Sequence, residues 1–330
     1  MSDWTIESPP LAMLRAQDST LLTLSTTGSA ALVDVAHGTS QALAGGPYHH
    51  GCLFEGGALV ISASQLLCFT RDGNERWRVD LEAGNVGRVF LGAKADAVVL
   101  LHRRRRFLFE RYTLDSGEYQ ETRVIERRRA IVVGGRVWAR DARGVSSFFL
   151  YGTQVERCPL KDNGPMEARG GSVYTLVGPR SVTRVMGGER RWFTTVKGRD
   201  LRKLSIRDGL EADEDEFEPA RLGRPRLFGG RLLVPDANGS LHALNVDDGS
   251  IAWRFDGQHY PTLSKPPRPA IVGETIGYVG ADEYLYAIDG AGGCTAFIEL
   301  PDAPDVPPVA ADGRLVVAAR GLHLYDLRAL

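Results

Sequence analysis

A short segment recurs along this chain and limits what the chain can fold into. In its clearest copy an apolar stretch, residues 243–246, leads to a turn that ends at Gly249, and Trp253 follows four residues later. A second copy runs from Ala287 to Phe297, with Phe in place of Trp. Recurrence of strand-like segments at a period of roughly 40–50 residues is typical of folds that array one supersecondary unit. The chain is therefore predicted to be a repeat protein.

Weaker copies of the segment occur elsewhere in the chain. Trp77 and Trp192 each follow a glycine by four residues, and comparable turns without a Trp contain Gly38, Gly117 and Gly152. Before each turn, an apolar run is broken by a second glycine-containing turn, such as Gly229-Gly230. Glycine suits tight hairpin turns because their central residues need positive φ. Each unit is therefore predicted to be four antiparallel strands, named A to D in chain order, as in one blade of a β-propeller.

The two ends of the chain complement each other. After the turn at Gly313 one C strand remains, residues 322–326, and no D strand follows it. At the other end, Trp4 lies in a strand-like segment that precedes the first A strand near residues 11–14. A last blade shared between both ends would leave no open sheet edge. We therefore expect an all-β propeller of eight four-stranded blades, with seven as the alternative, whose last blade is closed by the N-terminal strand.

The pattern Ala-x-Asp/Asn-x-x-x-Gly-x-x-x-Trp resembles the tryptophan-docking repeat of PQQ-like (quinoprotein-type) β-propellers. It is nearly complete at 243–253 and holds at 287–297 with Phe for Trp. The resemblance is to the non-enzymatic, short-chain type, similar to the outer-membrane assembly propeller lipoprotein. It implies that aromatic rings dock between neighbouring blades. This structural role is expected for Trp4, Trp77, Trp192, Trp253 and Phe297.

Composition favours one closed domain over residues 1–330. With 43% hydrophobic residues the chain can bury a large core, and its longest interruption is an inter-blade insertion at about 197–225. No apolar run approaches the roughly 18 residues that cross a bilayer, and the first residues lack the pattern of a secretory leader. The cysteines, 52, 68, 158 and 294, are isolated and expected to be free thiols. We therefore expect a cytoplasmic protein with no membrane contact, no metal and no cofactor; its Arg-rich composition suggests a bacterial source.

Charge is segregated along the chain although the formal net charge is only −1. In an antiparallel blade, A–B and C–D turns lie on one rim, and B–C turns and inter-blade loops lie on the other. The second rim is expected to carry two basic clusters, the 197–225 insertion with its acidic run, and the segment 257–269. Long loops in a compact domain are usually functional or disordered. The candidate binding residues on this rim are Arg103, Arg104, Arg105, Arg106, Arg127, Arg128, Arg129, His259 and Tyr260.

Three classes of function remain open. Catalysis is not expected, since no nucleophile–base arrangement, phosphate loop or metal motif is present, and the adjacent cysteines of quinoprotein dehydrogenases are missing. The chain is therefore predicted not to be an enzyme, and a quinoprotein-like oxidoreductase is the least favoured alternative. Nucleic-acid or other anion binding through the arginine clusters is a second alternative. The favoured hypothesis is a non-catalytic scaffold or adaptor subunit of a multi-protein complex that binds another protein, of unknown identity, through the second rim.

Overall fold

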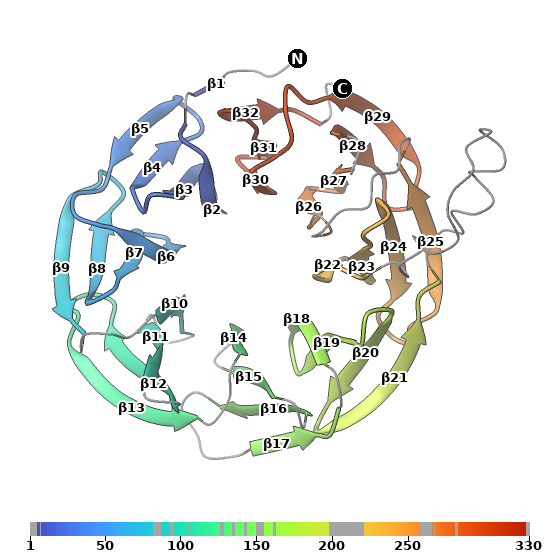
Figure 1. Ribbon diagram of the computed structural model, residues 1–330, viewed down its shortest axis with the longest axis horizontal. Coiled ribbons are helices and arrows are strands. Elements are labelled where there is room, and N and C mark those ends of the chain that lie inside the picture. The colour runs from blue at the N-terminus through green and yellow to red at the C-terminus, as the bar shows by residue number, and fades with distance from the viewer. Residues whose placement is uncertain are drawn as a thin grey trace, which may run out of the picture.

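The computed structural model describes these residues: 5–6, 8–81, 87–92, 96–103, 106–125, 129–133, 136–141, 144–149, 155–160, 163–197, 221–257, 266, 268–280 and 283–327. Every regular element among them is a β-strand. The strands form eight sheets of four, arranged around a common axis (Figure 1). The expected propeller of eight blades is confirmed, and the seven-bladed alternative is wrong.

The first four blades occupy the N-terminal half of the chain. Blade one consists of β2 (Leu11–Gln17), β3 (Thr20–Ser25), β4 (Ala30–Asp34) and β5 (Thr39–Ala42). Blade two consists of β6 (Tyr48–Phe54), β7 (Gly57–Ser62), β8 (Gln65–Thr70) and β9 (Glu75–Asp80). Blade three consists of β10 (Gly87–Leu91), β11 (Asp96–Arg103), β12 (Arg106–Thr113) and β13 (Tyr119–Ile125). Blade four consists of β14 (Arg129–Val133), β15 (Arg136–Asp141), β16 (Gly144–Phe149) and β17 (Val155–Cys158).

The remaining blades follow in chain order. Blade five consists of β18 (Asn163–Arg169), β19 (Ser172–Val177), β20 (Ser181–Met186) and β21 (Glu189–Thr195). Blade six consists of β22 (Arg226–Phe228), β23 (Arg231–Pro235), β24 (Ser240–Asn245) and β25 (Ile251–Asp256). Blade seven consists of β26 (Ala270–Val272), β27 (Thr275–Val279), β28 (Tyr284–Ile288) and β29 (Cys294–Glu299). Blade eight consists of β30 (Val306–Ala311), β31 (Arg314–Ala318), β32 (Leu322–Tyr325) and β1 (Thr5–Ile6).

The two ends of the chain close the ring in blade eight. Its strand order is β1-β32-β31-β30, so the outermost strand comes from the N-terminus (Figure 1). Thr5 pairs with His323 and Ile6 with Leu322, both antiparallel. The backbone N–H of Leu11, at the start of blade one, donates to Asp305 Oδ2 at 3.1 Å. The predicted closure by the N-terminal strand is confirmed, and it leaves no unpaired C strand in the last blade.

The hydrophobic core lies between neighbouring blades. One cluster joins buried side chains of blades one and two, and others join blades five and six or blades six and seven. The middle strands are covered on both faces, which explains why β7 is buried along its whole length and is apolar up to Ser62. The outer strands alternate between exposed and half-buried positions, as β29 does. Within the described residues, no helix long and apolar enough to span a membrane is found.

Three tryptophans contact the C–D turn of the next blade. Trp77 Nε1 donates to the carbonyl of Leu114 at 2.8 Å, Trp192 Nε1 to Val246 at 2.9 Å, and Trp253 Nε1 to Gly290 at 3.0 Å. Gly249 shows why the turn that receives a ring contains a glycine, because its φ is +74° and an added Cβ would lie 2.6 Å from Cε3 of Trp192, the docked ring of the preceding blade. These contacts have the geometry that the resemblance implied.

Two aromatic residues depart from the expected docking scheme. Phe297 is 52% exposed, and its ring contacts Tyr284 and Tyr286 of its own blade, so the interblade role expected for it is wrong. The reason is topological, since blade eight takes its outer strand from the N-terminus and has no C–D turn like those of the other blades. Trp138 lies outside the repeat pattern yet is 1% exposed, in a cluster that spans blades four and five. Trp4 lies outside the described residues.

Candidate functional site

The first strand of each blade lies closest to the axis (Figure 1). Three of these innermost strands carry a charged residue at the same level. Arg15 on β2, Glu167 on β18 and Arg226 on β22 each pair with the residue seven positions later, namely Leu22, Tyr174 and Leu233. The equal pairing offset places the three residues at one height along the axis, because hairpin geometry fixes register.

Three further arginines lie nearer the rim from which these strands start. Arg88 is the second residue of β10 and pairs with Leu100. Arg224 and Arg268 each precede the innermost strand of their blade by two residues, ahead of β22 and β26. We call Arg15, Arg88, Arg224, Arg226 and Arg268, together with Glu167, the axial cluster.

The arginines of the axial cluster influence one another across the axis. The pKa of Arg15 in blade one is lowered by burial first and then by the positive charge of Arg224 in blade six. Burial also lowers the pKa of Arg224, and the charges of Arg226 and Arg88 add to this effect. Arg15 and Arg224 nevertheless expose much of their surface to solvent. Groups that touch water while surrounded by protein are expected where blades enclose a central channel.

Within the described residues, Arg268 forms an ion pair with the one carboxylate of the axial cluster, Glu167. Its Nη2 lies 2.9 Å from Glu167 Oε2. Burial lowers the pKa of Arg268 to about 9, with Glu167 opposing the shift and the nearby arginines adding to it, so the group stays charged at neutral pH. Its Nε is buried and, in the described part of the chain, has no hydrogen-bond partner. An unsatisfied buried donor is uncommon and costs free energy.

Two residues of blade two border the axial cluster without adding charge. Burial, followed by the charges of Arg15 and Arg88, lowers the pKa of His50 to about 3. Its Nδ1 accepts a 3.4 Å hydrogen bond from the backbone N–H of Val89, as a neutral imidazole can. Burial raises the pKa of Cys52 to about 12, so this thiol stays protonated. Both side chains are therefore uncharged at neutral pH.

Backbone contacts within blade six, and close packing against the segment that leads to blade seven, hold Arg224 and its surroundings. Leu222 bridges to Asp236, and the N–H of Gly223 donates to the carbonyl of Pro235 at 2.7 Å. A Cβ on Gly223 would lie 2.6 Å from Pro266 Cβ and 3.0 Å from Pro235 Cγ. Only glycine fits between the two prolines, and this close approach brings the segments that lead to Arg224 and Arg268 together.

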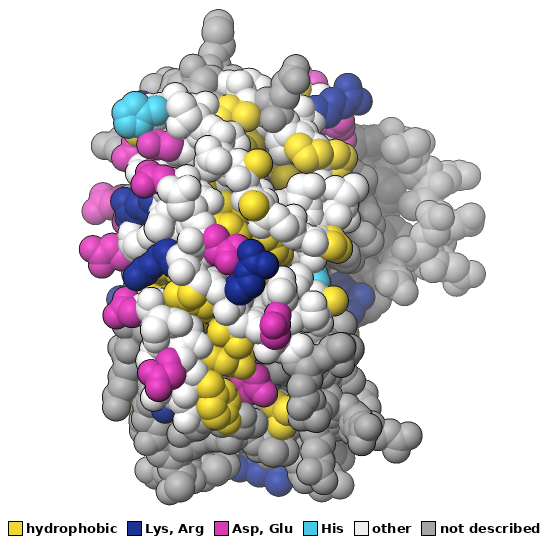
Figure 2. Space-filling view, turned by 90° about the vertical axis from the view of Figure 1, so that its left-hand side faces the viewer, with side chains coloured by type: hydrophobic (Ala, Val, Ile, Leu, Met, Phe, Trp, Pro, Cys, Tyr) yellow, Lys and Arg dark blue, Asp and Glu magenta, His cyan; other side chains and the backbone are white. Residues whose placement is uncertain are grey.

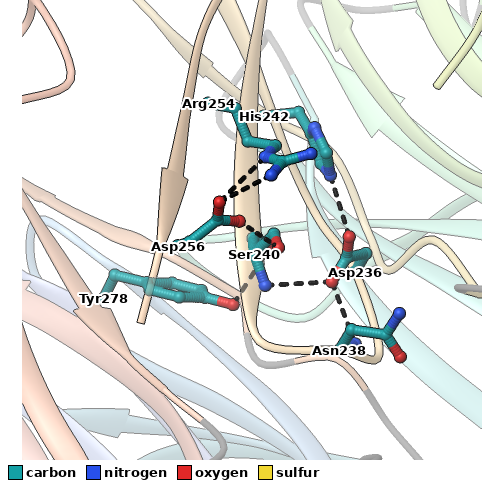
Figure 3. Close-up of polar contacts among 7 residues, drawn as sticks. All are labelled: Asp236, Asn238, Ser240, His242, Arg254, Asp256 and Tyr278. Atoms are coloured by element: carbon teal, nitrogen blue, oxygen red, sulfur yellow. Dashed lines mark hydrogen bonds and ion pairs between the residues drawn. The ribbon is translucent and has the colours of Figure 1, made fainter. Parts of the chain in front are cut away.

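A buried polar network forms the B–C turn of blade six (Figure 3). Asp236 Oδ2 lies 2.9 Å from His242 Nε2, and Asp236 Oδ1 accepts the backbone N–H groups of Asn238 and Ser240, each at 2.9 Å. Ser240 Oγ donates to Asp256 Oδ1 at 2.6 Å. The carboxylate and imidazole are almost fully buried, with Asp236 at 0% and His242 at 1% exposed.

This network stabilises the turn rather than forming a catalytic triad. His242 contacts Asp236, whereas the Ser240 hydroxyl is committed to Asp256, which also pairs with Arg254 at 2.7 Å. In a catalytic triad the imidazole lies between the serine hydroxyl and the carboxylate, whereas here Ser240 Oγ donates to Asp256 and His242 Nε2 contacts Asp236. The network holds the B–C turn of blade six in place. Asp236 of this turn forms a β-bridge with Leu222, two residues before Arg224, so the network also supports the position of Arg224.

The rim that carries the B–C turns and the inter-blade connections is called the loop rim, and the opposite one the plain rim. Arg103 ends β11 and pairs with Arg106 at the start of β12, as expected for a B–C turn on the loop rim. Phe107, the next residue, pairs with Ile125 at the end of β13, just before the second basic cluster. Arg129 begins β14, an innermost strand. The backbone thus places Arg103, Arg106 and Arg129 on the loop rim of the adjacent blades three and four.

The other sequence candidates lie outside the described residues: Arg104, Arg105, Arg127, Arg128, His259 and Tyr260. The same holds for the acidic run of the 197–225 insertion. Within the part of the chain that the structure describes, no group of three His, Cys, Asp or Glu side chains could hold a metal. On the outer face shown in Figure 2, acidic and basic side chains are mixed along one edge, in contrast to the axial cluster.

The axial cluster was not found by sequence reasoning, because each of its arginines is single in the sequence and lies in a different blade. A signal was nevertheless present. Glu167 and Arg226 each precede a Gly-Gly turn by three residues, and Arg268 precedes Gly273 by five. Because side chains alternate between the two faces of a strand, residues at the same distance before the A–B turn of their blades lie on the same side of the innermost strands. Counting residues back from that turn therefore identifies the side chains that face the axis.

The eight blades and the docked tryptophans define a PQQ-like β-propeller. The family model described as outer membrane protein assembly factor BamB matches residues 129–297, just over half of the chain. The chain therefore belongs to this family. None of the curated proteins compared with the chain matches it.

Solved structures show the same fold over nearly the whole chain. BamB from Moraxella catarrhalis is 11% identical with a TM-score of 0.66, covering 98% of this chain and 97% of that one. The computationally designed Ika8 protein is 10% identical with a TM-score of 0.70, and the coverage is 97% of each chain. Apo AztD from Citrobacter koseri is 13% identical with a TM-score of 0.62, covering 90% of this chain and 88% of its own.

The cytoplasmic location expected from the sequence is wrong. The matching family is described as an outer membrane protein assembly factor, and BamB is also a structural neighbour, which points to a non-cytoplasmic location. The earlier expectation rested partly on free cysteines. Free thiols show only that no disulfide framework is needed, and a domain with this large a core does not need one.

Proposed function

We propose that this chain is a non-catalytic scaffold subunit that binds another protein through its loop rim. The observation that carries the proposal is the difference between the two rims. On the plain rim the A–B turns are tight, and their left-handed residues include Asp18, Gly170 and Gly273, with φ of 52°, 56° and 58°. On the loop rim, the connection between β21 and β22 spans residues 196–225. Long connections on a rigid scaffold are where binding residues concentrate.

The comparisons support a protein partner. The matching family is described as an assembly factor, which by its nature works with other proteins. We carry only this general property over to the present chain, since the structural neighbours are too distant to identify a partner. Binding of nucleic acid through Arg103, Arg106 and Arg129 is the alternative, and it would weaken steeply with added salt.

The structure allows the long connection to be removed without opening the blade. Val196 N–H donates to the carbonyl of Arg180, and Leu222 N–H to the carbonyl of Pro179, both at 2.8 Å. Both ends of the connection are therefore anchored to the same turn, and a short Gly-Ser linker can replace residues 198–220. A matched control inserts the same linker on the plain rim of the same blade, between Gly187 and Gly188.

Capture from the native cells, followed by mass spectrometry, tests the proposal. The unchanged chain and the plain-rim control are expected to capture the same partner, whereas the loop-rim variant is expected to lose most of it. Thermal melting should show that both variants remain folded. Equal capture by the loop-rim variant and the unchanged chain, at both low and high salt, would argue against the proposed rim.

A further inference from the structure

We infer that the axial cluster is a binding site for a small oxyanion that carries several negative charges, of the phosphate or carboxylate type. The site comprises Arg15, Arg88, Arg224, Arg226 and Arg268, with Glu167 as a positioning partner of Arg268. It is separate from the protein-binding role proposed for the loop rim. It also differs from the surface arginines of blade three, because its members come from blades one, three, five, six and seven.

The balance of charge is the first argument. Five guanidinium groups face one carboxylate, and no other described carboxylate is among the charges that act on Arg15, Arg224 and Arg268. The neighbouring His50 and Cys52 are uncharged at neutral pH. Like charges that act on one another in this way destabilise the folded chain when no anion is present. A multivalent anion would remove that repulsion.

Available donors are the second argument. Among the described residues, Arg88, Arg224 and Arg226 have no ion-pair partner, and the Nε of Arg268 is buried without an acceptor. Guanidinium groups present donors in a planar fork that matches carboxylate and phosphate oxygens. The close packing of Gly223 between Pro235 and Pro266 holds two of these arginines in place without using their donors. The site therefore has fixed, unused donors of the kind that such oxyanions require.

The position on the axis limits the size and approach of the ligand. The innermost strands surround the cluster, so the ligand has to fit among them (Figure 1). Arg224 and Arg268 precede their strands and thus lie toward the loop rim. The exposure of Arg15, Arg88 and Arg224 shows that solvent reaches the cluster. A small anion can therefore enter from the loop rim.

Isothermal titration calorimetry with the full chain tests the inference, using tripolyphosphate and citrate as the two probes. At least one probe is expected to bind one equivalent, and the comparison between them tells a phosphate ligand from a carboxylate one. The variant Arg88→Gln/Arg224→Gln is expected to weaken that binding by about tenfold or more. The control Arg71→Gln/Arg191→Gln removes the same charge from exposed sites on the outside and should bind as the unchanged chain does.

Thermal melting without ligand separates a binding role from a structural one. Because the arginines repel one another, Arg88→Gln/Arg224→Gln is expected to melt at the same temperature as the unchanged chain or higher. A clearly lower melting temperature would show that these arginines stabilise the fold and would overturn the inference. Absence of binding by both probes at millimolar concentration, or binding that the double variant does not weaken, would also overturn it.

Discussion

Replacing Trp192 with Ala is expected to lower the free energy of unfolding by about 3–5 kcal/mol. The side chain is 8% exposed and packs against the C–D turn of blade six. Its indole N–H donates to Val246, and the adjacent Thr194 Oγ1 donates to the carbonyl of Gly249 at 2.6 Å. The substitution leaves a cavity between two blades and removes one of the two donors to the Val246 carbonyl, which keeps its 3.1 Å hydrogen bond from Arg184 Nη1. Chemical denaturation followed by circular dichroism measures the loss.

Trp253→Ala is the matched comparison, because Trp253 occupies the same position one blade later. It is only half buried, although its N–H makes the equivalent hydrogen bond to Gly290. A smaller loss, about 1–3 kcal/mol, is therefore expected. If Trp192→Ala proved nearly neutral, or less harmful than Trp253→Ala, interblade docking would not be a main source of stability in this ring.

Deleting residues 1–8 is expected to cost at least about 2 kcal/mol and to promote self-association. The deletion removes β1, which pairs with β32, and with it Ile6, which packs against the cluster between blades one and eight. The edge of β32 would then be unpaired, and Leu322, which is 1% exposed, would lose part of its cover. Thermal melting and size-exclusion chromatography report the two effects.

The milder variant Thr5→Ala is the control for this deletion. It removes the hydroxyl that lies 3.2 Å from His323 Nδ1 but keeps the strand pairing. A loss of about 0.5–1.5 kcal/mol is expected, as for a single hydrogen bond. Should the deletion cost no more than Thr5→Ala, the N-terminal strand would not be what closes the ring.

The repeat made the fold predictable, whereas the axial site was not. The blade count followed from the missing D strand after residue 326 and the extra strand-like segment at Trp4, and the B–C location of Arg103 followed from counting strands. Both inferences use local pattern and strand order, which a sequence contains directly. The axial cluster depends on ring closure, which brings Arg15 near Arg224 although about two hundred residues separate them.

The departure of two aromatic residues from the docking scheme has a similar origin. Phe297 matches the repeat pattern but has no turn of the usual kind to dock against, because the outer strand of blade eight comes from the other end of the chain. Trp138 lacks the pattern yet fills the space between blades four and five. The pattern describes one kind of contact between blades. It does not predict whether the next blade has a turn against which the ring can dock, or whether another aromatic residue fills the space between two blades.

Site-specific photo-crosslinking tests most directly whether the loop rim is the surface that binds a protein partner. Arg180 and Glu189 suit this test because both are exposed, and because Arg180 directly precedes β20 on the loop rim whereas Glu189 begins β21 on the plain rim. A photoreactive residue placed at either position should leave the blade intact, and mass spectrometry identifies what it captures in the native cells. Reproducible crosslinks to one partner from position 180, with none from position 189, are the predicted result. Crosslinks to that partner from position 189 and not from position 180 would contradict the account.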